Sequence, residues 1–245
     1  MHQPYFCPWL GYFSKLHYAD CFVVLDDVHF RKRHYIDRTK IVDMHGNVSW
    51  VGIPVGQHYQ EPCRDVMITD TSFVSRLITT IEQSYAKALF FDREKDSTLA
   101  IIASAIRSDV SLVDIDCDII RGLSEHVSIS LPPIIYSSKI AQAADPTTRI
   151  IEVCASLGAS EILVGDGSSG RVHDWARVRE AGITVFKQNF SAEHPIYGQA
   201  RRRRLPFMPG LSILDAIFNV GRFQTRSFIT NPNLAPQPFS SEEVR

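Results

Sequence analysis

The chain has little that would mark it as a membrane, secreted or nucleic-acid-binding protein. No apolar run approaches the roughly 20 residues that a membrane-spanning helix requires. The formal net charge is -1, so no basic excess points to nucleic acid as the main partner. The five cysteines include no Cys-x-x-Cys pair, and their odd number agrees with reduced thiols. We therefore expect a cytoplasmic protein with no membrane span and no nucleic-acid partner.

Apolar periodicity predicts an α/β fold in one large domain. The 245 residues suffice for such a domain, and a strand, a helix and a strand are expected at 161–164, 171–181 and 183–186. Their short connections allow the two strands to pair only as a right-handed parallel crossover. We predict a mixed, mostly parallel Rossmann-like sheet with helices on both faces and a helical middle segment from about 70 to about 130. The single domain would span 1–230, and the Pro- and Asn-rich segment 231–245 would be a flexible tail.

Other elements are predicted from local signals. Strands are expected at 21–25 and 48–55, and the turn at 44–47 would join them as an antiparallel hairpin. Asp145 and Pro146 predict the start of a helix that Gly158 closes. Ser212 and Asp215 form the capping box of a last helix, which we expect to stop at Gly221.

The first fifty residues hold the clearest candidates for a site. The apolar strand Phe22-Val23-Val24-Leu25 runs directly into Asp26 and Asp27. Ligands of open α/β sheets bind at the carboxyl ends of strands, so these acids would face a crevice. Alternatively, they only end the strand and cap a turn. The basic and aromatic run from Arg31 to Arg38 favours a site.

Several segments resemble one known family, the WbqC-like proteins, in order from end to end. The similar segments are His2-Gln3-Pro4-Tyr5-Phe6-Cys7-Pro8-Trp9-Leu10-Gly11-Tyr12-Phe13, Phe22 to Phe30, Arg31-Lys32-Arg33 with Arg38, Trp50 to Val55, Gly158 to Gly165, His194 to Gln199, and Leu211 to Gly221. Members are often encoded in surface-polysaccharide loci and in natural-product clusters. The resemblance implies a role in attaching acyl or aminoacyl groups, such as glycyl, to amino sugars. Members usually carry apolar strand residues before the His-Gln-Pro, so either the first strand here is very short or the natural start lies upstream of Met1.

A glycine-rich loop and an arginine run are candidates for binding anions. Gly165, Gly167, Ser168 and Ser169 lie between a strand and a helix, where backbone N–H groups can converge on phosphate. The loop matches neither a dinucleotide nor a Walker pattern, and a tight turn explains its glycines equally well. The four consecutive arginines Arg201, Arg202, Arg203 and Arg204 form either a solvated loop or a docking patch for an acidic carrier protein or a diphosphate.

No metal site is expected, because His29, His34 and Asp37 match no known ligand spacing. His2 is a candidate general base, or otherwise a hydrogen-bonded histidine near the start of the first strand. Cys7 would line the site without acting as a nucleophile.

From these features we expect an enzyme that forms an amide between an activated donor, most plausibly a carrier-protein thioester, and a small amine such as an amino sugar or amino acid. Asp27, Asp26 and His2 would take the amine proton. The substrate-binding candidates are Gln3, Tyr5, Cys7, Trp9, Tyr12, Arg33, Arg38 and the loop residues Gly165, Gly167, Ser168 and Ser169. No cofactor is expected beyond phosphopantetheine on an acyl or peptidyl carrier protein. The alternatives are an adenylate-forming or nucleotidyl-transferring enzyme that uses ATP and Mg²⁺, and a non-catalytic binding module.

Overall fold

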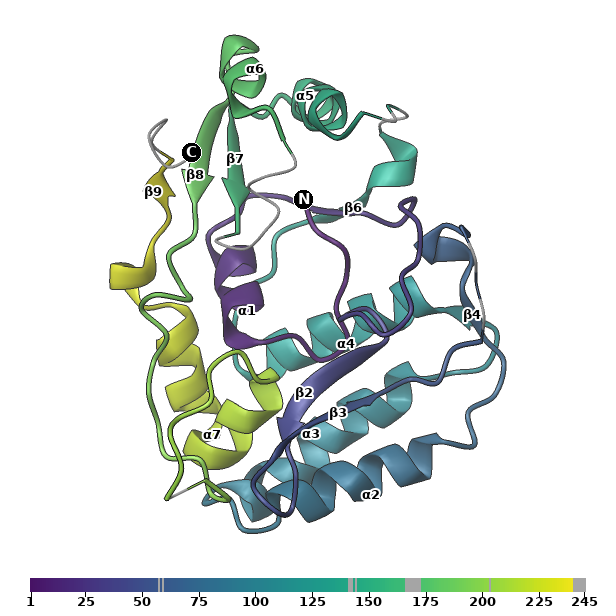
Figure 1. Cartoon of the computed structure of the whole chain (residues 1–245), viewed down its shortest axis with the longest axis vertical. Helices are drawn as coiled ribbons and strands as arrows, with labels where there is room; N and C mark the ends of the chain where they lie inside the picture. The colour runs from purple at the N-terminus through teal and green to yellow at the C-terminus, as the bar shows by residue number, and fades with distance from the viewer. Residues whose placement is uncertain are drawn as a thin grey trace.

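The computed structural model describes residues 1–56, 58, 60–140, 143, 145–165, 173–202 and 204–239. Helices and strands alternate along most of the chain (Figure 1). In chain order the elements are α1 Leu10–His17, β1 Phe22–Val24, β2 Arg38–Val42, β3 Val48–Gly52, β4 Met67–Ile68, α2 Val74–Tyr85, α3 Phe91–Ala105, β5 Val110–Ser111, α4 Leu112–His126, β6 Ile134–Tyr136, α5 Pro146–Leu157, β7 Glu161–Val164, α6 Trp175–Glu180, β8 Thr184–Lys187, α7 Ile213–Ile229 and β9 Gln237–Pro238. Within the described residues, no helix is both long and apolar enough to cross a membrane.

The α/β class predicted from the sequence is confirmed, and the described strands form four small sheets. β1 pairs with β6 in parallel, and β7 pairs with β8 in parallel. The pairs β2 with β3, β4 with β5, and β8 with β9 are antiparallel. His2 extends the first sheet, since it forms a parallel bridge with Val24 on the strand edge that β6 leaves open.

The predicted hairpin is present, but one of its strands was assigned wrongly. The turn at 43–47 joins β3 to β2, whereas the strand near 21–25 pairs with β6, more than 100 residues later. The sequence Arg38-Thr39-Lys40-Ile41-Val42 was not recognised as a strand because its charged residues continue the preceding basic run. Only Thr39, Ile41 and Val42 of this strand are buried.

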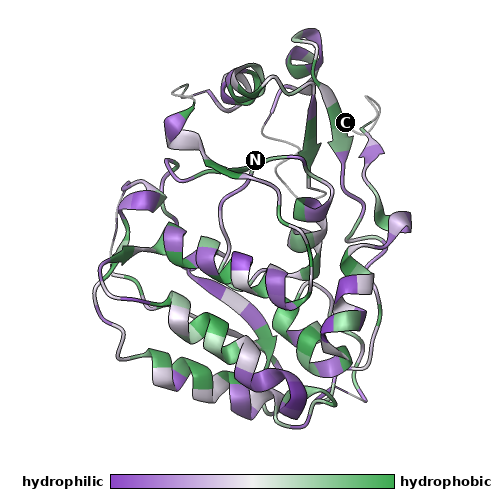
Figure 2. Cartoon of the chain, turned by 180° about the vertical axis from the view of Figure 1, so that it is seen from behind, coloured by the Kyte–Doolittle hydropathy of each residue, from purple (hydrophilic) through white to green (hydrophobic). Residues whose placement is uncertain are grey.

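The middle segment is helical as predicted, and three helices, α2, α3 and α4, fill it. Each shows hydrophobic and hydrophilic stripes, as expected of helices that bury one face (Figure 2). α3 begins at Phe91, and Phe91 and Glu94 in its first turn are already buried.

The last helix does not stop at Gly221. α7 continues to Ile229 across a kink at Gly221, which has φ 79° and ψ 160°. A side chain at Gly221 would stand 2.7 Å from the Phe90 ring, so the close approach of that ring requires glycine here. Ser212 caps the helix as predicted, by accepting the Leu214 N–H at 3.3 Å.

The C-terminal segment begins with an ordered stretch. Leu234 is buried and β9 hydrogen-bonds to β8, while residues 240–245 of the predicted flexible tail lie outside the described part. The flexibility predicted for 231–245 therefore stays a prediction.

Two separate apolar clusters position the functional site. The larger cluster joins α1, β1, the middle helices and α7. The smaller one joins α5, β7, α6 and β8, at the opposite end of the molecule in Figure 1. Residues 1–5 and the segment that follows β1 lie between the two clusters, where ligand sites commonly occur.

Candidate functional site

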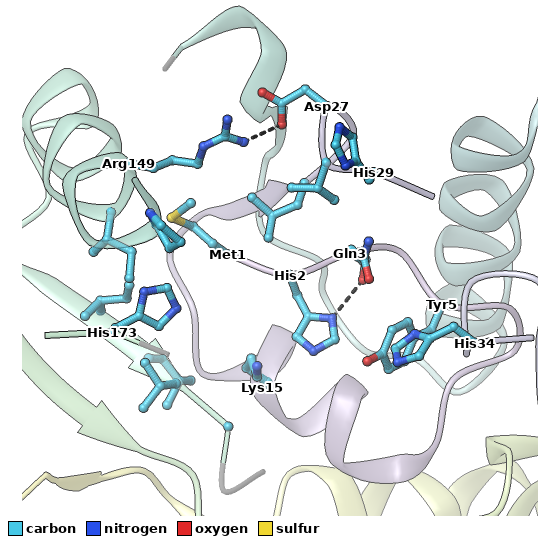
Figure 3. Close-up of a pocket in the computed structure, with 18 of the residues that line it drawn as sticks. Met1, His2, Gln3, Tyr5, Lys15, Asp27, His29, His34, Arg149 and His173 are labelled. Atoms are coloured by element: carbon cyan, nitrogen blue, oxygen red, sulfur yellow. Dashed lines mark hydrogen bonds and ion pairs between the residues drawn. The ribbon is translucent and has the colours of Figure 1, made fainter. Parts of the chain in front are cut away.

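A cavity of about 690 Å³ lies between the two apolar clusters, at the carboxyl ends of β1 and β7 (Figure 3). Its described lining is Met1, His2, Gln3, Tyr5, Lys15, Leu25, Asp27, Val28, His29, Arg31, His34, Pro146, Arg149, Ile150, Ile162, Leu163, Val164, Gly165, His173 and Trp175. Parallel strands that end at a common crevice are the arrangement in which α/β proteins bind ligands. We call this space the first cavity.

A second cavity of about 470 Å³ adjoins the first. The two share His2, Tyr5, Lys15, His34 and Gly165. The rest of the second cavity is lined by Trp9, Gly11, Tyr12, Tyr35, Gln188, Ser191, His194, Pro209 and Gly210. It is therefore largely aromatic, and its aromatic rings are packed together: Tyr5 stacks on Tyr35 with ring centroids 5.1 Å apart.

His2 lies where the two cavities meet, and its tautomer is set by the backbone. Its Nδ1 is 2.8 Å from the carbonyl oxygen of Gln3. A carbonyl can only accept, so Nδ1 carries the proton and Nε2 holds a free lone pair. Burial, and then the charge of Lys15, lower the pKa of His2 well below its ordinary value. The imidazole is therefore neutral at pH 7 and able to accept a proton at Nε2.

The two adjacent carboxylates have different surroundings, as expected for neighbouring residues of an extended chain. Asp27 lines the first cavity and forms an ion pair with Arg149, whose Nη1 is 2.8 Å from Oδ1. Asp26 lies outside the cavity lining and is buried. It accepts hydrogen bonds from the Ser138 N–H at 2.9 Å and from the Ser138 hydroxyl at 2.6 Å. Asp26 therefore holds the segment after β6 in place, while Asp27 orients Arg149.

Four aromatic and amide residues of the first segment line the two cavities. Gln3 lines the first cavity, Tyr5 lines both, and Trp9 and Tyr12 line the second. The Tyr12 hydroxyl donates to the Gln3 carbonyl at 3.0 Å, the same oxygen that fixes His2.

Three predicted substrate-binding residues do not reach either cavity. Cys7 is fully buried in the larger core, and burial raises the pKa of its thiol well above the ordinary value. Arg38 packs over the Trp50 ring at 4.1 Å and lines a separate hollow beside α2. Arg33 is exposed and has a left-handed φ of 64°, and its carbonyl accepts a hydrogen bond from Arg38.

The glycine loop is only partly described. Gly165 follows β7 and lines both cavities, whereas Gly167, Ser168 and Ser169 lie outside the described residues. In the described part of the chain, no group of three or more His, Cys, Asp or Glu could hold a metal ion.

Two basic residues of the first cavity, Lys15 and Arg149, are not predicted from the sequence, whereas Arg31 begins the basic run that the sequence indicates. The sequence does offer a signal for Lys15, because a lysine interrupts the largely apolar run of the short helix α1. In the structure its side chain is 9% exposed. Arg149 carried no signal, because it is 122 residues from its partner Asp27.

Two of the four consecutive arginines bind the protein itself. Arg201 donates to the Gln83 carbonyl at 3.0 Å, and Arg202 donates to the Gly46 carbonyl at 2.6 Å and to the Pro206 carbonyl at 3.1 Å. Arg204 is exposed and makes no such bond with the described residues, while Arg203 lies outside them. Docking of an acidic partner by this run stays a prediction.

These contacts give different expectations for two neighbouring arginines. Arg202→Ser should lower the free energy of unfolding by about 1–2 kcal/mol, since three donors to backbone carbonyls are lost. The matched control Arg204→Ser should change it by less than about 0.5 kcal/mol. Urea unfolding measures both, and equal effects would contradict a structural role for Arg202.

Comparison with known proteins covers almost the whole chain. The family model of the WbqC-like protein family matches residues 3–227. The chain is similar to the uncharacterized protein Rv1507c of Mycobacterium tuberculosis (strain ATCC 25618 / H37Rv), with 26% identity over 226 residues that cover 89% of this chain and 92% of that protein. No solved structure matches significantly. The segments that carry the resemblance thus lie within one continuous match, and the chain belongs to the WbqC-like protein family.

Proposed function

We propose that the chain is an acyl or aminoacyl transferase that forms an amide between a carrier-protein thioester and an amine, such as an amino sugar or an amino acid, in polysaccharide or natural-product biosynthesis. The observation that carries this proposal is the position of neutral His2 at the junction of two chemically different cavities. A transferase must hold two substrates and remove a proton where they meet.

The reaction requires one bond to form and one to break. The amine nitrogen attacks the thioester carbonyl carbon, the C–N bond forms, and the C–S bond breaks to release the carrier thiolate. Nε2 of His2 accepts the proton that the amine loses and returns it to the departing thiolate. No oxidant, ATP or metal ion is required for this balance.

The cation next to His2 suits the charge that develops in the reaction. Lys15 lines both cavities, and its charge acts on His2 strongly enough to lower the histidine pKa. An ammonium ion in this position stabilises the negative oxygen of the tetrahedral intermediate. The mostly apolar walls near β7 and α5 strengthen this interaction by excluding water.

The acids have a supporting role in this proposal. Asp27 is paired with Arg149, and Asp26 accepts from Ser138, so both already have partners. These bonds also disfavour the alternative in which Asp26 and Asp27 hold Mg²⁺, because the ion would have to displace Arg149 and the Ser138 donors.

Product formation tests the proposal. The acetyl and glycyl thioesters of 4′-phosphopantetheine are incubated with amino acids and with a nucleoside-diphosphate amino sugar. Release of free thiol in equal amount to an amide, detected by mass spectrometry without ATP, supports the transferase. Amide that forms only with ATP and Mg²⁺, together with AMP, would overturn it in favour of the adenylate-forming enzyme. Stabilisation of the protein by a thioester without any product would favour a binding module.

A further inference from the structure

The two cavities differ in charge, which bears on what each can bind. The described lining of the first cavity includes two guanidinium groups, Arg31 and Arg149, against one carboxylate, Asp27. The described lining of the second includes neither an arginine nor a carboxylate. Positive charge is therefore concentrated in the first cavity, although the whole protein has a formal net charge of -1.

Arg149 is held rigidly at the wall of this cavity. Its Nη1 binds Asp27 at 2.8 Å, its Nε donates to the Ala143 carbonyl at 2.9 Å, and only 17% of its side chain is exposed. It stands one turn into α5, where the helix dipole disfavours a cation. An arginine at position 149 therefore lowers the stability of α5. The fixed orientation of its guanidinium group suits the binding of an anion.

Arg31 differs from Arg149 in exposure and in pairing. It is exposed at the rim and forms no hydrogen bond or ion pair with any residue in the described ranges. Its charge nevertheless acts inside the cavity, since, after burial, it lowers the pKa of His34. The lining of the first cavity therefore offers an anion two guanidinium groups, one fixed and one without a partner among the described residues.

We propose that Arg31 and Arg149 form a phosphate subsite that takes the phosphomonoester or diphosphate group of the substrate in the first cavity. Planar guanidinium groups bind phosphate bidentately. The inference deepens the proposed function. It assigns the phosphorylated substrate to the first cavity and leaves the aromatic second cavity to its reaction partner.

Paired probes test the subsite without requiring turnover. Isothermal titration measures Kd for 4′-phosphopantetheine against pantetheine and for UDP against uridine. The phosphorylated member of at least one pair should bind at least tenfold more tightly. The pair that shows this preference identifies the source of the phosphate, a carrier-derived donor or a nucleotide-linked acceptor. Equal affinities within both pairs, or no binding of any probe, would overturn the proposal.

Variants separate a built subsite from general charge attraction. Arg31→Gln should weaken binding of the preferred probe about tenfold, since a charge-assisted hydrogen bond is lost. The matched control Arg107→Gln removes an exposed cation that follows α3 and pairs with Asp118 of α4, and its Kd should equal that of the wild type. Because Arg31 is exposed, the variant should fold normally. Equal Kd values for the two variants would also overturn the proposal.

The outcomes distinguish this inference from the proposed function. Phosphate selectivity without any amide product would keep the subsite and remove the transferase. Turnover of pantetheine and phosphopantetheine thioesters at the same kcat/KM, with no preference for UDP, would keep the transferase and remove the subsite.

Discussion

His2→Asn is expected to lower the turnover number of amide formation by 10²–10⁴-fold, the usual contribution of a positioned general base. Asparagine retains an N–H that can donate to the Gln3 carbonyl, as Nδ1 of His2 does at 2.8 Å. It lacks a basic nitrogen at the Nε2 position. The KM values should change little, because the variant removes proton transfer and leaves both cavities intact.

The matched control is His17→Asn, which changes an exposed histidine of α1 outside both cavities. Its turnover number should equal that of the wild type. A His2→Asn variant that keeps more than a tenth of the wild-type turnover would contradict the role of His2 as the base.

The pH profile offers a second measurement at the same group. Neutral His2 is the active form, so the turnover number should show an acid limb at the lowered pKa of His2, below 6.5. Lys15→Gln removes a charge that lowers this pKa, so the acid limb should move to higher pH. An acid limb that stays in place would show that it belongs to another group.

Much of the fold follows from local signals in the sequence. The helix α5 is capped by Asp145 and closed by Gly158 as predicted, because the Asp145 side chain accepts the Thr148 N–H and Gly158 adopts a left-handed φ of 63°. The parallel pairing of β7 with β8 follows from their short connection. Such features depend on neighbouring residues, which the sequence displays directly.

Long-range contacts explain what the sequence did not reveal. β1 pairs with β6, and Asp27 pairs with Arg149, across more than 100 residues. Nothing in either segment alone indicates its partner. The candidate site was therefore located through its first half, the segment from His2 to Tyr12, while the cations supplied from elsewhere were not predicted.

Two segments that carry the family resemblance, 194–199 and 211–221, meet in a buried hydrogen-bond network remote from His2 in the sequence. The Tyr197 hydroxyl and the Gln199 side-chain amide each donate to Asp215 Oδ2 at 2.9 Å. Asn219 accepts the Ala200 N–H at 2.8 Å. Asp215 was expected to complete a capping box, but its carboxylate instead joins α7 to the segment before it. In these two segments, the residues that carry the family resemblance therefore have a structural role.

Asp215→Asn is expected to change how the stability of the protein depends on pH. Burial raises the pKa of Asp215 to about 6, against an ordinary value of 3.8. The folded protein therefore binds this proton more tightly than the unfolded chain does. The resulting stability is fully present below pH 3.8 and is lost as pH rises through 6.

A shift of this size corresponds to roughly 3 kcal/mol over the whole titration, of which about 2 kcal/mol falls between pH 4.5 and pH 7.5. The free energy of unfolding, measured in urea at these two pH values, should therefore decline with rising pH by about 2 kcal/mol more in the wild type than in Asp215→Asn. The histidines with lowered pKa values favour the folded state as pH rises, but they are common to both proteins, so their effect cancels in the difference. The control Asp20→Asn, at an exposed position, should follow the wild-type profile. If the free energy of unfolding depends on pH in the same way in wild type and Asp215→Asn, the pKa of Asp215 is not raised by burial. The hydrogen-bond network would then have to stabilise the carboxylate charge beyond the Tyr197 and Gln199 bonds.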